Sequence, residues 1–119
     1  MSKAVKIYHN PRCSKSRETL NLLQSHGVEP EVVLYLETPA DAATLRQLLK
    51  MLGMESAREL MRRKEDLYAS LNLADSSLSE DELIQAMVEH PKLMERPIVV
   101  ANGQARIGRP PEHVLEIIG

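Results

Sequence analysis

Alternating and helically spaced apolar residues divide the first third of the chain into three elements. Ala4–Tyr8 alternates apolar and polar side chains, which predicts a short strand. Leucines at helical spacing then predict a helix with Ser14 as its N-cap and an end at His26-Gly27. Glu31–Leu36 predicts a second strand. A strand, a helix and a strand in this order form a βαβ unit with parallel strands.

The middle of the chain has helical periodicity throughout. A helix with Thr38 as its N-cap and a stop at Gly53 is predicted first. A shorter and more highly charged helical pattern follows over Ser56–Leu73. Ser79 then precedes three acidic residues and caps a further helix that ends at His90-Pro91.

Strand patterns return near the end of the chain. Pro97–Ala101 and Gln104–Ile107 flank Asn102-Gly103, a strong hairpin signal, and Pro110-Pro111 begins a last helix. Gly103 and Gly108 are interpreted as turn glycines. No repeat or linker interrupts this order. The pattern predicts an α/β fold, a thioredoxin-like mixed four-stranded sheet (βαβ…ββα) with a helical insertion, in a single domain spanning residues 1–119.

Composition narrows the class of protein further. The 119 residues are 43% hydrophobic and 27% charged, as in globular domains, and a net charge of −2 gives no reason to expect nucleic acid or a membrane as a partner. No apolar run is long enough to cross a bilayer, and Met1-Ser2-Lys3 does not begin a signal peptide. A single cysteine cannot form an internal disulfide, so a cytoplasmic location is expected.

The single cysteine lies in "HNPRCSKSR", residues 9–17, where the first helix is predicted to begin. Backbone N–H groups at a helix N-terminus favour a thiolate or a bound anion, and Arg12, Lys15 and Arg17 add positive charge. A lowered pKa and a nucleophilic role for Cys13 are therefore predicted. The alternative, a small buried core residue, fits poorly with such polar neighbours. Ser16 stands where a dithiol oxidoreductase has its second cysteine, so any disulfide formed in turnover must involve another molecule.

Five separated segments carry a resemblance to a known family: "IYHNPRCSKSR", "LYLETP", "RELMRRKEDLY", "HPKLMERPIVV" and "GRPPEHVLEI". They resemble the glutaredoxin-coupled arsenate reductases, thioredoxin-fold enzymes with one catalytic cysteine. The resemblance implies an oxidoreductase of arsenic detoxification that reduces arsenate to arsenite. In that family the cysteine forms an adduct with arsenic, glutathione displaces water from the adduct, and glutaredoxin reduces the mixed species. Glutathione is then a co-substrate, and no bound cofactor is expected.

The same resemblance implies roles for individual residues. Cys13 takes the place of the nucleophile, and Arg62, Arg96 and Arg109 take the places of three oxyanion-binding arginines. His9 matches a histidine thought to tune the thiol or its hydrogen bonds, and Ser16 is a supporting residue. By similarity, the Arg96-Pro97 peptide bond is expected to be cis.

Reasoning from the residues alone leaves some of these roles open. Arg96 and Arg109 flank the predicted hairpin at its two ends, where both could face one anion. Arg62 lies among other basic residues and fits a solvated helix face equally well. Arg106 is expected at the surface, and His9 could be a satisfied turn residue. The histidines share no ligand spacing, so no metal site is expected.

Two other functions compete with arsenate reduction. One is a redox regulator similar to the Spx proteins, which bind RNA polymerase, and the other is a thiol reductase with a different substrate. Ser16 in place of a second cysteine counts against a disulfide switch, and the arginines favour oxyanion chemistry. The expected partners are arsenate, glutathione and glutaredoxin, with no nucleic acid and no membrane, and the protein is expected to be a monomer.

Overall fold

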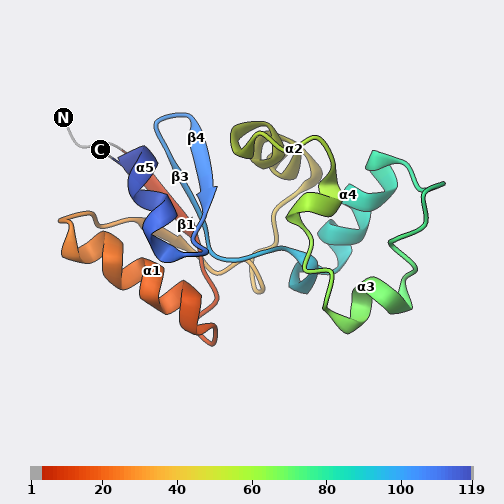
Figure 1. Cartoon of the computed structure of the whole chain (residues 1–119), viewed down its shortest axis with the longest axis horizontal. Helices are drawn as coiled ribbons and strands as arrows, with labels where there is room; N and C mark the ends of the chain where they lie inside the picture. Colours follow the sequence, from red (N-terminus) through yellow and green to blue (C-terminus); the bar gives the residue numbers. More distant parts are fainter. Residues whose placement is uncertain (1–3, 119) are drawn as a thin grey trace. The chain divides into compact units, whose positions relative to one another are not determined.

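The structure is a computed structural model that describes residues 4–118 (Figure 1). Its elements, in chain order, are β1 (Val5–Tyr8), α1 (Ser14–Ser25), β2 (Glu31–Val33), α2 (Ala42–Leu52), η1 (Ala57–Leu60), α3 (Asp66–Ser70), α4 (Glu80–Glu89), η2 (Pro91–Leu93), β3 (Ile98–Ala101), β4 (Gln104–Ile107), η3 (Pro111–Val114) and α5 (Leu115–Ile118), where η marks a 3₁₀ helix. The chain forms two compact units. The sheet unit comprises the residues up to Thr38 and from Arg96 onward, and the helical unit comprises Pro39–Glu95. The prediction of a single domain over residues 1–119 includes Met1–Lys3 and Gly119, which lie outside the described residues, and it stays a prediction.

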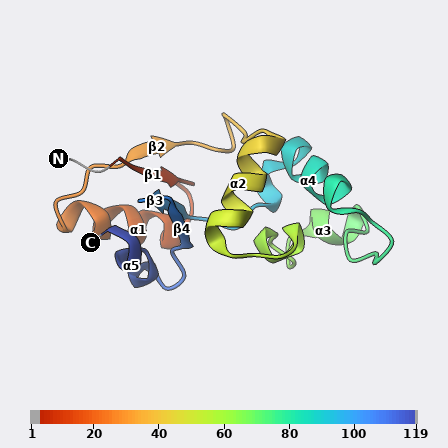
Figure 2. The same ribbon diagram turned by 90° about the horizontal axis from the view of Figure 1, so that it is seen from above.

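The sheet unit contains a mixed four-stranded sheet in the order β2-β1-β3-β4 (Figure 2). β1 is parallel to β2 and antiparallel to β3, and β3 is antiparallel to β4. In this register Ile7 lies opposite Val32 on one side and opposite Val99 on the other. The predicted βαβ…ββα order is therefore confirmed.

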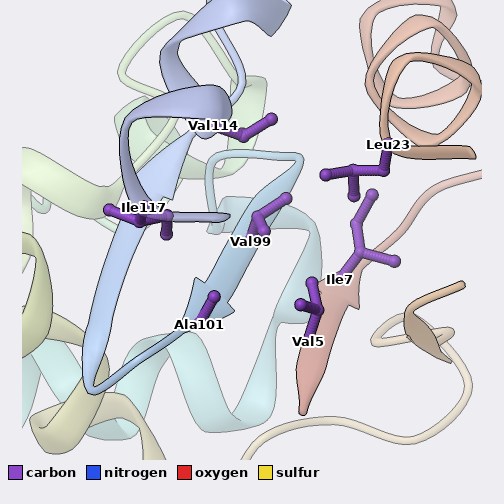
Figure 3. Packing of buried hydrophobic residues seen from close by; sticks show 7 residues of the cluster. All are labelled: Val5, Ile7, Leu23, Val99, Ala101, Val114 and Ile117. Atoms are coloured by element: carbon purple, nitrogen blue, oxygen red, sulfur yellow. The ribbon is translucent and has the colours of Figure 1, made fainter. Parts of the chain in front are cut away.

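One hydrophobic cluster holds helices against a single face of this sheet (Figure 3). Its buried members come from β1, α1, β3, η3 and α5: Val5, Ile7, Leu23, Val99, Ala101, Val114 and Ile117. The strand residues are all odd-numbered, as expected for side chains that share one face of a sheet. Leu23 has no exposed surface, so α1 is anchored to the sheet by its C-terminal half. This packing fixes the N-terminus of α1 beside the end of β1.

The β3–β4 hairpin turns at Asn102-Gly103 as predicted. Both residues have positive φ, 55° and 72°, which a two-residue turn of this hand requires. Ile98 then pairs with Ile107, so the residues just before β3 and just after β4 lie at the same end of the hairpin. The Gly108 N–H donates to the Pro97 carbonyl at 2.9 Å and extends the pairing by one step.

Several boundaries in the sheet unit differ from the prediction, and β1 and β3 each begin one residue later, at Val5 and Ile98. Cys13, not Ser14, is the N-cap of α1, because Cys13 has extended backbone angles and its carbonyl accepts the Arg17 N–H at 3.0 Å. The second strand ends at Val33 and not at Leu36. The Leu34 carbonyl accepts the N–H groups of Glu37 and Thr38, and this turn leaves no strand beyond Val33.

Capping residues and a helix-terminating glycine explain where the main helices of the helical unit begin and end. Asp41, not Thr38, caps α2, since its carboxylate accepts the Thr44 N–H at 2.8 Å. The predicted stop at Gly53 is confirmed by its left-handed backbone, with φ +73°. The predicted cap at Ser79 is also confirmed, and the structure shows that it forms a capping box with Glu82. In the sheet unit, the last predicted helix begins as η3 and continues as α5.

The prediction of one continuous helical segment over Ser56–Leu73 is wrong. The chain forms only the short helices η1 and α3 there, and Met61 between them bridges to Met94. The Arg62 N–H donates to the Leu93 carbonyl at 2.6 Å and not to a residue in the preceding turn, so the backbone at Arg62 is not helical. Within residues 4–118, no helix has the length and apolar character needed to span a membrane.

Candidate active site

Cys13 lies at the junction between β1 and α1. Its N–H donates to the Asn10 carbonyl at 3.0 Å, which closes a tight turn, and its extended backbone begins the helix. The Cys13 side chain makes no capping hydrogen bond of its own, and no acidic residue occupies the first helical turn. The N-terminus of α1 therefore presents its backbone N–H groups toward the sulfur without competition from a carboxylate.

Opposing effects act on the pKa of the Cys13 thiol. Cys13 is buried, with 9% of its surface exposed, and this burial alone would raise the pKa. The backbone N–H of Ser16, the charge of Arg96, the backbone N–H of Lys15 and the charge of Arg109 all favour the thiolate. Their combined effect is larger, and the pKa of Cys13 lies below its ordinary value. The predicted direction of this pKa is confirmed.

Arg109 brings its positive charge directly to the sulfur. Its Nη2 donates to Cys13 Sγ across 3.7 Å, and its Nε donates to the Arg96 carbonyl at 3.0 Å. The second contact links the segment just after β4 to the segment just before β3. Arg96 is half-buried and Arg109 is exposed, so one guanidinium is partly shielded from water while the other is open to it. The Arg96-Pro97 bond is cis as predicted, and Arg109-Pro110, for which no prediction was made, is also cis.

His9 and Ser16 form a buried pair beside the cysteine turn. A hydrogen bond of 2.6 Å joins His9 Nδ1 and Ser16 Oγ, and Ser16 Oγ also accepts the Asn10 N–H at 3.0 Å. Burial, followed by the charge of Arg17, holds the pKa of His9 below its usual value. A neutral imidazole can accept the Ser16 hydroxyl hydrogen at Nδ1. Ser16 therefore supports the loop that positions Cys13.

Gly108 is a residue whose importance the sequence interpretation missed. Its φ is not positive, so the reason for glycine is close packing and not turn geometry. A Cβ at this position would lie 2.5 Å from Thr19 Oγ1 and 2.8 Å from Pro97 Cγ. Thr19 is fully buried in α1. The end of β4 therefore contacts α1 at a point where only hydrogen fits, immediately before Arg109.

Arg62 belongs to the helical unit and lies in an irregular segment after η1. Its Nη1 pairs with the Glu65 carboxylate at 3.3 Å and donates to the Lys92 carbonyl at 3.5 Å. The side chain is half-buried and not on a fully solvated helix face. Its place as a third oxyanion ligand stays a prediction. Arg106, expected at the surface, is partly exposed and pairs with Glu116 at 2.9 Å.

The strand order and the position of Cys13 at the N-cap of α1 define a thioredoxin-fold protein with a single candidate reactive cysteine. The chain belongs to the ArsC family, whose family model matches residues 8–117. It is 85% identical to the uncharacterized protein YfgD of Escherichia coli K12 over the full length of both chains. It is also 51% identical to the arsenate reductase of Haemophilus influenzae, covering 97% of this chain and 99% of that protein. The solved structure of the arsenate reductase from Vibrio cholerae matches with a TM-score of 0.96 at 60% identity, over 98% of this chain and 99% of that one.

Proposed function

We propose that this protein reduces arsenate to arsenite through Cys13, with glutathione and glutaredoxin as external reductants. The observation that carries the proposal is the contact of 3.7 Å between Arg109 Nη2 and Cys13 Sγ at the N-terminus of α1. A tetrahedral oxyanion that approaches this sulfur meets a guanidinium and backbone N–H groups together. Such donors bind an oxyanion and stabilise the charge on the adduct that forms from it.

The proposed reaction consists of three steps in which a thiol attacks, followed by a hydrolysis. The Cys13 thiolate attacks arsenic, so that an S–As bond forms and one As–O bond breaks, with the oxygen leaving as water after protonation. Glutathione then replaces a second oxygen in the same way. A glutaredoxin thiolate then attacks the glutathione sulfur, so that an S–S bond forms and the S–As bond to glutathione breaks. The two thiols are oxidised to a glutathione–glutaredoxin mixed disulfide, and the electron pair of the broken bond stays on arsenic, which is reduced from arsenic(V) to arsenic(III). Water finally cleaves the Cys13–As bond, which releases arsenite and restores the thiol.

The arginines suit the oxyanion because they stay charged at every relevant pH. Arg96 and Arg109 both favour a negative charge at the Cys13 sulfur, as the lowered pKa of Cys13 indicates. Arg62 is proposed as a third donor, and to serve it must exchange its ion pair with Glu65 for one with the substrate. The proposal places the reaction in the cytoplasm, where thiols are kept reduced, and it includes action as a monomer.

The test is arsenite formation in a mixture of arsenate, glutathione and glutaredoxin. Cys13→Ser should be inactive, and Arg96→Ala should lower kcat/KM about 10- to 100-fold, as for loss of one charged donor. Arg106→Ala is the matched control, because it removes an arginine of the β3–β4 hairpin whose side chain pairs with Glu116 of α5. No arsenite above the Cys13→Ser background would refute the proposal. Turnover of another oxidised substrate in that case would favour a thiol reductase.

A further inference from the structure

Asn10 holds the loop that carries Cys13 together through three hydrogen bonds. Its N–H donates to Ser16 Oγ at 3.0 Å, and its carbonyl accepts the Cys13 N–H at 3.0 Å. Its side-chain oxygen Oδ1 accepts the Arg12 N–H, also at 3.0 Å. Asn10 thus connects the segment after β1 both to the first turn of α1 and to the two residues that precede this helix. Only the bond to Arg12 depends on the asparagine side chain.

The same hydrogen bonds decide which backbone N–H groups face the Cys13 sulfur. The N–H groups of Arg12 and Cys13 are both bonded to Asn10. The N–H groups of Lys15 and Ser16, which follow the cysteine in the chain, favour the thiolate. An oxyanion that approaches the sulfur therefore meets the N–H groups of the first turn of α1 and not those of the loop before it.

The geometry of the turn does not by itself require asparagine at position 10. Residues 10–13 form a turn with Asn10 in its first position and Pro11 in its second, and the bond from Oδ1 to the N–H two residues later is an Asx turn. Aspartate forms the same turn, and its carboxylate accepts a stronger hydrogen bond than an amide oxygen does. The stability of the loop therefore gives no reason for asparagine in place of aspartate.

Charge is the property that separates asparagine from aspartate here. Asn10 supplies the acceptor without a negative charge, in the same turn as a sulfur that its surroundings stabilise as an anion. Residues 9–17 contain three lysine and arginine side chains and no acidic residue. The next residue, Glu18, is acidic and pairs with Lys15 at 3.4 Å. A carboxylate at position 10 would oppose both the thiolate of Cys13 and an oxyanion bound beside it.

We infer that Asn10 is a positioning residue of the proposed reaction, and that it must accept a hydrogen bond and stay uncharged. Its amide oxygen fixes the loop, so that the Cys13 sulfur stays at the N-terminus of α1. Its neutrality preserves the positive surroundings of the sulfur. Asn10 acts through the backbone of Arg12 and Cys13 and does not itself bind the substrate. The role of Asn10 in turnover rests on the proposed function, whereas its effect on the thiol does not.

Four variants separate the two requirements. Asn10→Asp keeps the acceptor and adds a charge, Asn10→Ala removes the acceptor without adding a charge, and Asn10→Ser restores a weaker, uncharged acceptor. Asn21→Asp is the matched control, because it adds the same charge at an exposed position of α1 about two turns further along. Each full-length variant is examined by iodoacetamide alkylation of Cys13 across pH, by urea unfolding and by arsenite formation.

Asn10→Asp should unfold as the wild type does but ionise its thiol less readily. The first and last Cα atoms of a turn lie within about 7 Å, and two unit charges at that distance in water change an equilibrium about threefold. Alkylation below the thiol pKa should therefore slow about threefold or more, and kcat/KM for arsenate, a dianion, should fall about tenfold or more. Asn10→Ala should instead lose stability with a smaller change in the thiol pKa, and Asn10→Ser should recover part of that stability. Asn21→Asp should match the wild type in all three measurements.

An Asn10→Asp protein with the alkylation profile of the wild type would overturn the inference. A loss of stability in Asn10→Asp as large as that in Asn10→Ala would also overturn it, because the carboxylate would then not replace the amide. Equal effects of Asn10→Asp and Asn21→Asp would do the same, because the position of the charge would then be unimportant. A wild-type protein that makes no arsenite, with the expected order of thiol pKa values among the variants, would refute the proposed function and leave Asn10 assigned to the thiol. The two failures are therefore distinguishable.

Discussion

Replacement of Gly108 by alanine tests how the fold positions Arg109 beside the thiol. The new Cβ would lie 2.5 Å and 3.0 Å from two Thr19 side-chain atoms and 2.8 Å from Pro97 Cγ. These atoms cannot withdraw easily. Thr19 is fully buried and its hydroxyl donates to the Lys15 carbonyl at 2.8 Å, while Pro97 is buried as well. We expect the end of β4 to move away from α1 and to carry Arg109 with it.

Two magnitudes follow from this displacement. Insertion of one methyl group into a packed contact costs about 1–3 kcal/mol of folding free energy. Two unit charges about 4 Å apart in water interact by about 1 kcal/mol, and this value is a lower limit because Arg109 is exposed but Cys13 is buried. Loss of the 3.7 Å contact with Cys13 therefore reduces the thiolate population at least about fivefold at a pH below the pKa. The pKa of Cys13 rises.

The assay is the iodoacetamide alkylation rate of Cys13 across pH, together with urea unfolding. Gly27→Ala is the matched control. It places an alanine at φ +76°, which costs about 1–2 kcal/mol, and its Cβ meets no atom within 4 Å. Both variants should lose stability, but only Gly108→Ala should raise the pKa of Cys13 and weaken arsenate binding. Thr19→Ala in the Gly108→Ala background removes two of the three close atoms and should restore part of the effect. A Gly108→Ala protein with an unchanged thiol pKa would refute this account of the contact.

Two further predictions concern the cysteine turn. Because the pKa of Cys13 lies below its ordinary value, alkylation should reach its plateau at a lower pH than for free cysteine. The same ionisation should stabilise the fold relative to Cys13→Ser. This stabilisation is complete above the ordinary thiol pKa and is lost as the pH falls to the lower pKa of Cys13 in the folded protein. An alkylation rate that depends on pH as it does for free cysteine would contradict both expectations. Ser16→Ala removes the partner of His9 and Asn10 and should cost about 1–3 kcal/mol in urea unfolding, whereas exposed Ser14→Ala should change stability by less than about 0.5 kcal/mol. Equal losses in these two variants would show that the buried hydrogen bonds of Ser16 contribute little.

Features that depend on local chemistry were predictable from the sequence. Asn102-Gly103 and Gly53 were identified because positive φ favours these residue types, and both sites have it. The cap at Ser79 was identified because its hydrogen bond reaches a residue only three positions away, Glu82. In each case the residues that determine the conformation are neighbours in the chain.

Features that depend on distant contacts were not predictable. The helical pattern of Ser56–Leu73 is interrupted because Met61 pairs with Met94, more than thirty residues later in the chain. The apolar pattern of the second strand continues past Val33 because Tyr35 is buried, although its backbone has already turned. Burial produces the same alternation in a turn as in a strand, so the pattern alone could not locate the end of β2.

The candidate site shows the same division between local and distant effects. Cys13 could be recognised from its basic neighbours. Its contact with Arg109 could not, because Arg109 follows Gly108, which packs closely against Thr19, a residue 89 positions earlier in the chain. Ser16 is the clearest case. Its backbone N–H lowers the pKa of Cys13, while its hydroxyl turns inward to the buried His9. A hydroxyl donates and accepts stronger hydrogen bonds than a thiol does, so serine at this position supports the loop better than cysteine would. The position that holds a resolving thiol in dithiol oxidoreductases thus supports Cys13 here, and the second sulfur of the proposed reaction comes from a separate molecule.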